Sequence, residues 1–146
     1  MKKLYYLTKW RVSAFKLFVK SKYQLLRYGY EFKDAWNLDV ATAKWILPRL
    51  KHLRNNTQSH PNDLTFEEWQ KTLDQMIYAF EFVLNEEDIL EKCYPDDFDY
   101  GFNRGEDNKM IFKDDRKPDY TYYNKCREKY NLGIQKFSSY FQNLWD

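Results

Sequence analysis

Four acidic residues have types and spacing that suit metal-dependent chemistry on nucleotides or phosphoesters. Glu67, Asp74 and Glu81 recur every seven residues, which places them along one edge of a helix. Asp39 lies near the start of the helix before it. Carboxylates that converge from two helices can hold a divalent ion, but such sites also use histidine or glutamate pairs at short helical spacing. These residues supply no such pair, so a metal-dependent hydrolase is an alternative interpretation.

A solvated acidic face explains the same carboxylates, and we favour it. The basic partners expected for this face are Lys44 or Arg49. The histidines and cysteines have no metal-ligand spacing; they are His52, His60, Cys93 and Cys126. We expect both cysteines to be reduced and buried. The sequence therefore predicts no catalytic residue, no metal ligand and no cofactor.

An acidic segment at residues 95–118 is the second candidate for chemistry. A calcium-binding loop needs acids at its first, third and fifth positions, glycine at the sixth and glutamate at the twelfth. Counting from Asp97, Gly101 arrives one residue early and Asn108 takes the twelfth position, so the calcium motif fails. We predict instead an acidic surface for a partner. Its residues are Asp96, Asp97, Asp99, Glu106, Asp107, Asp114 and Asp115.

A basic helix near the start of the chain is the third candidate. Its Lys and Arg residues alternate with aromatic ones, and such residues neutralise phosphates while aromatic rings stack on bases. The candidate partner-binding residues are Lys9, Arg11, Lys16, Lys20, Lys22 and Arg27. Core packing of the aromatic residues is the alternative that helical spacing favours. A helix lying on a membrane surface is a further option, which we do not expect.

Helical periodicity extends over most of the chain and predicts the elements that must position these residues. Apolar residues recur at steps of three and four, which is typical of amphipathic helices. We predict an all-α fold, a single-domain bundle of about four helices with a long acidic loop between the third and fourth. The expected helices cover residues 8–27, 34–54, 65–92 and 119–145, and the loop covers 95–118, with a short hairpin as one form it could take.

Local signals mark several helix boundaries. Gly29 should end the first helix, and Pro48 should kink the second without ending it, because the apolar pattern continues beyond it. Thr65 and Glu68 have the spacing of a capping box at the start of the third helix. Leu64 and Trp69 flank that cap at the positions of a hydrophobic staple.

Charge is segregated along the chain, although the net charge is only +2. Residues 1–54 contain 13 Lys and Arg against 3 acidic residues, and residues 55–100 contain 2 against 12. These segments either neutralise each other in the fold or form separate binding surfaces. The 29 aromatic residues and 4 glycines argue against a disordered chain. No secretion signal or membrane span is recognisable, so we expect a cytoplasmic protein.

Three segments together resemble a widespread group of small tailed-bacteriophage proteins of uncharacterised function. They are the stretch from Trp36-Asn37-Leu38-Asp39 to Leu50, the stretch from Glu68-Trp69 to Glu81, and the terminal Tyr140 to Asp146. The resemblance covers about residues 34–84 and 130–146. Its recurring polar positions are Asp39, Arg49, His60, Glu81 and Asp146. The resemblance implies a shared pattern of helix packing and no particular activity.

Three functions follow as hypotheses. The first is a phage-encoded, non-enzymatic accessory protein that binds a host protein or nucleoprotein complex in the bacterial cytoplasm. Such a protein could inhibit a nucleic-acid-guided defence complex, as anti-CRISPR proteins do. The second is the metal-dependent hydrolase, and the third is direct nucleic-acid binding through the basic first helix. We expect no membrane partner, and the oligomeric state stays open.

Overall fold

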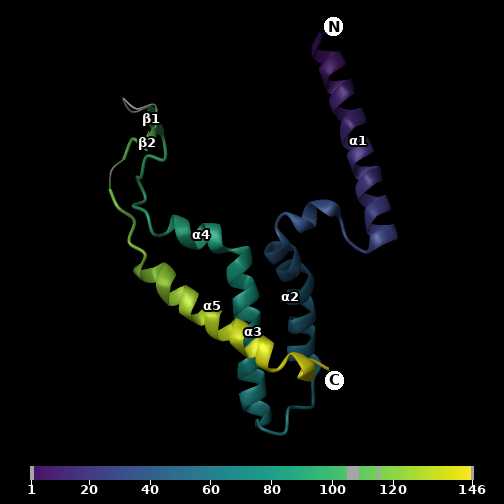
Figure 1. Ribbon diagram of the computed structural model, residues 1–146, viewed down its shortest axis with the longest axis vertical. Helices are drawn as coiled ribbons and strands as arrows, with labels where there is room; N and C mark the ends of the chain where they lie inside the picture. Colours follow the sequence, from purple (N-terminus) through teal and green to yellow (C-terminus); the bar gives the residue numbers. More distant parts are fainter. Residues whose placement is uncertain (1, 105–108, 115, 146) are drawn as a thin grey trace. The chain divides into compact units, whose positions relative to one another are not determined.

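The computed structural model describes residues 2–104, 109–114 and 116–145, and of residues 2–13 and Phe112 the backbone alone. It confirms the all-α class, since the chain is mostly helical with one small sheet. The α-helices are α1 (Lys2–Tyr28), α2 (Leu38–Asn56), α3 (Phe66–Leu84), α4 (Glu86–Glu91) and α5 (Thr121–Ser139) (Figure 1). Short 3₁₀ helices are η1 (Phe32–Ala35) and η2 (Phe141–Asn143), and the strands are β1 (Phe102–Arg104) and β2 (Met110–Phe112).

The chain forms two compact units, Met1–Thr42 and Ala43–Asp146, which we call the N-terminal and C-terminal units. The prediction of a single domain remains a prediction. The N-terminal unit consists of α1, η1 and the first turn of α2. Gly29 ends α1 as predicted, because its φ of +79° lies in the left-handed region that glycine adopts without strain. The backbone of Phe32 then donates a hydrogen bond to the buried Gln24 side chain, which holds η1 against the end of α1.

Two predicted helix starts, those of α1 and α2, need correction. Helix α1 begins at Lys2, well before residue 8. Helix α2 begins at Leu38 and not at residue 34, because η1 occupies Phe32–Ala35 and Asp34 accepts a hydrogen bond from the Glu31 backbone in a capping box. The helix continues through Pro48 to Asn56, as the apolar pattern predicts.

The predicted third helix is in fact two helices. Its start is confirmed, because Thr65 and Glu68 form the capping box and Glu68 accepts a 2.8 Å hydrogen bond from the Thr65 backbone. The expected continuation to residue 92 is wrong. Asn85 leaves the helical conformation, with φ −119° and ψ 15°, while its side chain donates to the Glu81 carbonyl at 2.7 Å. An asparagine side chain competes with the backbone in this way, so α3 ends and α4 follows.

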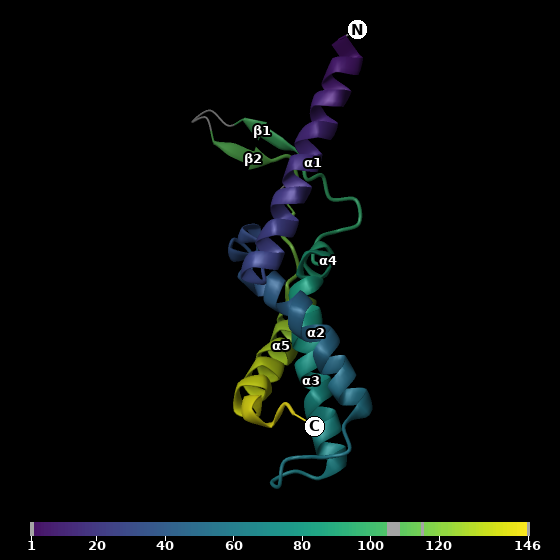
Figure 2. The same cartoon turned by 90° about the vertical axis from the view of Figure 1, so that its right-hand side faces the viewer.

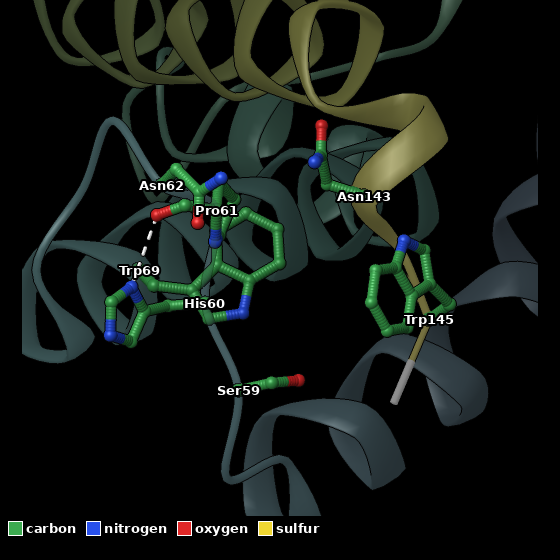
Figure 3. Close-up of a pocket in the computed structure, with 7 residues that line it drawn as sticks. All are labelled: Ser59, His60, Pro61, Asn62, Trp69, Asn143 and Trp145. Carbon is green, nitrogen blue, oxygen red and sulfur yellow. Dashed lines mark hydrogen bonds between the residues drawn. The ribbon is translucent and has the colours of Figure 1, made fainter.

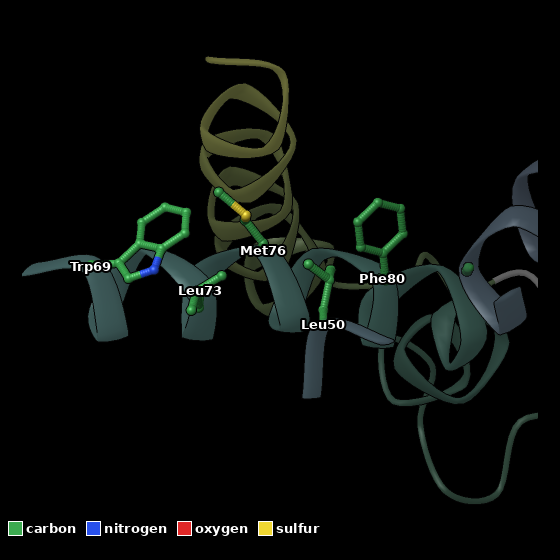
Figure 4. Close-up of a cluster of buried hydrophobic side chains, with 6 residues drawn as sticks. Leu50, Trp69, Leu73, Met76 and Phe80 are labelled. Carbon is green, nitrogen blue, oxygen red and sulfur yellow. The ribbon is translucent and has the colours of Figure 1, made fainter. Parts of the chain in front are cut away.

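The main core of the C-terminal unit lies where α2, α3 and α5 meet. Figure 4 shows Trp69, Met76 and Phe80 extending from α3, with Leu50 contributed by α2. The Phe80 ring meets Phe137 of α5 edge to face at 5.1 Å between centroids. These side chains are almost fully buried, and their apolar area is the main source of stability for this unit.

A second, smaller core lies between the end of α3, α4 and the start of α5. Its buried residues are Phe82, Cys93, Tyr123 and Cys126. The burial expected for both cysteines is confirmed, and both are free thiols. The Asp119 backbone donates to the Cys93 carbonyl at 2.8 Å, which ties the chain before α5 to the chain after α4. Asp119 also accepts from the Thr121 backbone, so α5 begins at Thr121 and not at residue 119.

Segment 95–118 contains the antiparallel hairpin of β1 and β2, with Phe102 opposite Phe112 and Arg104 opposite Met110. The short hairpin expected as one form of this loop is therefore present. At the other end of α5, the helix stops at Ser139 and not at residue 145, because Tyr140 leaves the helical region with φ −108°. The chain then turns through η2.

Helices α3 and α5 approach closely at Gly133, and both views of the structure show them lying against each other (Figures 1 and 2). A Cβ atom built on Gly133 would lie 2.2 Å from the Gln75 carbonyl oxygen and 2.7 Å from the Ala79 Cβ. Backbone cannot move aside as a flexible side chain can. Only glycine therefore allows this helix spacing.

We predict that Gly133→Ala lowers the free energy of unfolding by about 1–3 kcal/mol, the usual cost of overpacking. The measurement is urea denaturation followed by circular dichroism. Asn131→Ala, on the exposed side of the same helix, is the control and should stay within about 0.5 kcal/mol of the wild type. Equal stability of the two variants would contradict the close approach of α3 and α5.

Candidate functional site

The basic candidates of the first helix all lie on α1. Lys16, Lys20, Lys22 and Arg27 are exposed, whereas the side chains of Lys9 and Arg11 lie outside the described residues. Lys16, Lys20 and Arg27 share one face of the helix, and Lys22 faces away from Lys20 because residues two apart point in nearly opposite directions. The Lys22 ammonium lies 5.5 Å from the centroid of the Phe18 ring. The described residues therefore give a basic stripe of three side chains.

An apolar stripe borders this basic stripe, and it is exposed. Phe15 and Leu26 are 67% and 88% exposed, and Val19 and Tyr23 are about half exposed. Core packing of the aromatic residues, the alternative that helical spacing favours, is therefore wrong for Phe15 and Tyr23. Trp36, in the chain that follows α1, is 89% exposed. Helical spacing identifies an amphipathic face but does not say whether the fold covers it.

Two of the four helix carboxylates, Asp74 and Glu81, form ion pairs. The Arg54 guanidinium donates to both oxygens of Asp74, at 2.8 and 3.2 Å. The Lys51 ammonium lies 2.6 Å from a Glu81 oxygen. The expected partners Lys44 and Arg49 are therefore corrected to Lys51 and Arg54, which lie three residues apart and so share the face of α2 turned toward α3.

This arrangement does not favour the metal-dependent hydrolase. Seven residues of helix rise about 10 Å, so Glu67, Asp74 and Glu81 are too widely spaced to share one ion. Among the described residues, no group of three or more His, Cys, Asp or Glu side chains could hold a metal ion. Asp39 lies exposed in the first turn of α2, where its negative charge interacts favourably with the positive end of the helix dipole.

The acidic residues around the hairpin are held together by Arg116. Its guanidinium donates to both oxygens of Asp114 and, through Nη1, to Asp97 at 2.9 Å. Asp114 also accepts from the Asp99 backbone, at 3.3 Å. Asp96, Asp97 and Asp99 are exposed, whereas Glu106, Asp107 and Asp115 lie outside the described residues. Among the described acidic residues of this segment, Asp97 and Asp114 thus share the Arg116 cation, and Asp99 lies 4.0 Å from the Lys113 ammonium.

Hydrogen bonds from Arg116 hold the pKa of Asp114 well below its ordinary value of 3.8. The side chain of Asp114 is 11% exposed, so these bonds are partly shielded from water. A carboxylate with a lowered pKa stabilises the fold fully above its ordinary pKa and loses this contribution as the pH falls through the lower value.

A polar pocket of about 220 Å³ lies between the loop before α3 and the chain that follows α5 (Figure 3). Its walls include Ser59, His60, Asn62, Trp69, Asn143 and Trp145. The Nδ1 atom of His60 lies 3.0 Å from the Pro61 carbonyl oxygen, the contact drawn in Figure 3. Trp69 is 1% exposed and Trp145 is 65% exposed, so the pocket has one buried and one open indole wall.

A larger and mostly apolar pocket of about 410 Å³ shares Trp145 with the polar one. It is lined on the α2 side by Trp45 and Arg49, whose guanidinium lies 4.1 Å from the Trp45 ring centroid. The recurring positions Arg49 and His60 therefore line neighbouring pockets. Glu81 is in its ion pair elsewhere on α3, and Asp146 lies outside the described residues.

The polar pocket was not predicted from the sequence. Its walls come from two stretches of the chain, residues 59–69 and 143–145, that are far apart in sequence, and no local motif connects the two stretches. The only signal was the concentration of polar residues before Thr65. Comparisons with protein-family models, with curated proteins and with solved structures found no match for this chain. Across the described residues, no helix is both long enough and apolar enough to cross a membrane.

We predict that Arg116→Ala raises the pKa of Asp114 toward 3.8, because the pKa is lowered first by hydrogen bonding to that guanidinium. Carboxyl carbon chemical shifts, followed by NMR as a function of pH, measure this directly. The exposed neighbour Lys117 supplies the control, since Lys117→Ala removes the same charge without removing a hydrogen bond to Asp114. An unchanged Asp114 titration in Arg116→Ala would exclude the ion-pair arrangement.

Proposed function

We propose that this chain is a non-enzymatic binding protein and that α1 is its surface for single-stranded nucleic acid. The observation that carries this proposal is the exposure, on one helix, of a basic stripe beside an apolar and aromatic stripe. Proteins that bind single strands combine cationic grooves along the backbone with aromatic rings on which bases stack. Lys16, Lys20 and Arg27 supply the charges, and Phe15 and Tyr23 supply the rings.

The geometry of α1 suits a phosphate backbone. Lys16 and Arg27 are eleven residues apart, so the basic stripe spans about 16 Å along the helix axis. Among the described residues, none of its three side chains forms an ion pair with an acidic partner. Charges that are not neutralised within the protein are available to displace counterions from a nucleic acid, which is the main source of such affinity.

The exposed apolar area also supports a binding role. Contiguous exposed apolar surface on a soluble domain commonly marks an interaction site. Binding to a protein groove would require the apolar stripe alone, and binding to an anionic membrane surface would use both stripes. We favour nucleic acid because Tyr23, which lies three residues from Lys20 and four from Arg27, places an exposed aromatic ring beside the basic stripe. The other two partners are outcomes of the test below.

We further propose that the nucleic acid belongs to a bacterial nucleoprotein complex and that the chain is a bacteriophage accessory protein acting on it, such as an inhibitor of a nucleic-acid-guided defence complex. The resemblance of residues 34–84 and 130–146 to phage proteins supports this origin. Affinity purification from a bacterial lysate tests it. The complex should be recovered with the wild type and lost after nuclease treatment, and recovery that survives nuclease would contradict binding through nucleic acid.

We predict that Lys16→Glu and Lys20→Glu each weaken binding of a fluorescein-labelled single-stranded RNA. Removal of one phosphate contact should reduce the slope of log K against log salt by about 0.7. Fluorescence anisotropy at several salt concentrations measures both effects. Lys22→Glu makes the same charge change away from the basic stripe, on the far border of the apolar stripe beside Val19 and Leu26, and should have the smaller effect.

Three results would contradict the proposal. The first is that the wild type does not bind RNA, or binds it with an affinity that depends little on salt. The second is that Lys22→Glu weakens RNA binding as much as Lys20→Glu does. The protein could also bind vesicles of phosphatidylserine and phosphatidylcholine and not RNA, which would assign α1 to a membrane surface. Circular dichroism confirms that each variant keeps its helix content.

A further inference from the structure

The indole N–H of Trp69 is the most informative group in the polar pocket. Trp69 is almost fully buried, and its ring packs edge to face on Tyr140 at 5.7 Å. No described residue accepts a hydrogen bond from its indole nitrogen. Every completely buried side-chain nitrogen among the described residues has a partner, so this nitrogen retains some accessible surface. Figure 3 shows it facing the space that Ser59 and Trp145 border.

Neutral hydrogen-bonding groups make up the other polar walls. Asn62 and Asn143 are among the wall residues, and each carries a carboxamide, which offers two donors and an acceptor. No Asp, Glu, Lys or Arg side chain lines the pocket within the described part of the chain. Apart from the His60 imidazole, the polar side chains that line the pocket in the described part of the chain are uncharged, so the walls suit a neutral group with donors and acceptors on one edge.

Trp145 adds a flat apolar wall opposite these groups. Its ring is 65% exposed and borders the pocket on the side away from Trp69 (Figure 3). An exposed indole is a stacking platform for a planar ring. A planar, neutral ligand with alternating donors and acceptors along its edge is a nucleobase, and carboxamide side chains commonly pair with such edges.

We propose that this pocket binds a nucleobase. The base stacks on Trp145, its edge pairs with the Asn62 and Asn143 carboxamides, and one of its acceptor atoms takes the hydrogen bond from the Trp69 indole. The base could belong to a free nucleoside or to an unpaired position in a strand. Because every wall residue belongs to the C-terminal unit, the inference is independent of the function proposed for α1.

NMR of the five tryptophan indole N–H groups tests this proposal on the full chain. Adenosine, guanosine, cytidine and uridine are titrated separately, and ribose alone is the control ligand. We expect saturable shifts of the Trp69 and Trp145 signals with at least one nucleoside, while the Trp36 and Trp45 signals stay unchanged. Single Trp→Phe substitutions at positions 10, 36, 45 and 145 assign four signals and leave Trp69 by elimination.

Two variants and a matched control locate the site. Trp145→Ala should weaken nucleoside binding about fivefold or more, the range expected for loss of base stacking. Asn143→Ala keeps the Trp145 stacking platform. It should weaken nucleoside binding about two- to tenfold, through loss of hydrogen bonds. Trp36→Ala removes an even more exposed indole that does not line the pocket and should leave binding unchanged.

Several outcomes would overturn the proposal. They are the absence of saturable shifts at millimolar nucleoside, an equal response to ribose alone, or an equal loss of binding in Trp36→Ala. A labelled oligonucleotide and its abasic counterpart separate the two sources of the base. If the base belongs to a strand, the normal oligonucleotide shifts the Trp69 signal at lower concentration than the nucleoside does, and the abasic one leaves it unchanged. Lys16→Glu should not alter nucleoside shifts, so failure of the α1 proposal is distinguishable from failure of this one.

Discussion

The close approach of α3 and α5 at Gly133 is the constraint on which the C-terminal unit depends. Because no side chain separates the helices there, Phe137 reaches Phe80 on one side and Tyr123 reaches Phe82 on the other, at 5.9 Å between ring centroids. Both cores therefore share this single contact. Helix α5 also places Tyr140 against Trp69, and the chain that follows it, with η2 and Trp145, lies near the loop before α3. The polar pocket therefore depends on the close packing of α5 on α3.

Several charged side chains of the C-terminal unit form ion pairs within that unit. Lys51 and Arg54 pair with acids of α3, and Arg116 holds two aspartates beside the hairpin. Exposed pairs of this kind contribute little to stability, but they leave few uncompensated charges on the faces they occupy. In α1 the basic stripe has no such partners among the described residues. The segregation of charge along the sequence thus has two outcomes, compensation within one unit and an open basic surface in the other.

Local signals predicted the parts of the fold that are determined locally. Gly29, the capping box at Thr65 and the continuation past Pro48 follow from interactions within a few residues, and each is confirmed. The break at Asn85 was missed because an asparagine late in an amphipathic pattern is compatible with a helix that continues and with one that ends. The hydrogen bond from its side chain to the Glu81 carbonyl, which decides between them, is visible only in the structure.

Predictions that required tertiary knowledge were less successful. Periodicity predicts that Phe15 and Leu26 share an apolar face, but it cannot reveal that both side chains are exposed. The choice of Lys51 over Lys44 as the partner of an α3 acid depends on how α2 is rotated against α3. The polar pocket is the extreme case, since Asn62, Trp69 and Asn143 meet only after three segments have packed.

The two buried thiols of the second core allow local opening of this part of the molecule to be measured by thiol modification. Cys93 and Cys126 are the only cysteines, and both lie in the small cluster that joins α3, α4 and α5. A thiol-modifying reagent can reach them only when that cluster opens, so the rate of modification measures local opening at the α4 end of the unit. The main core contains no thiol, which makes the measurement specific to the second core. The sequence thus provides a native reporter of how the two cores are coupled.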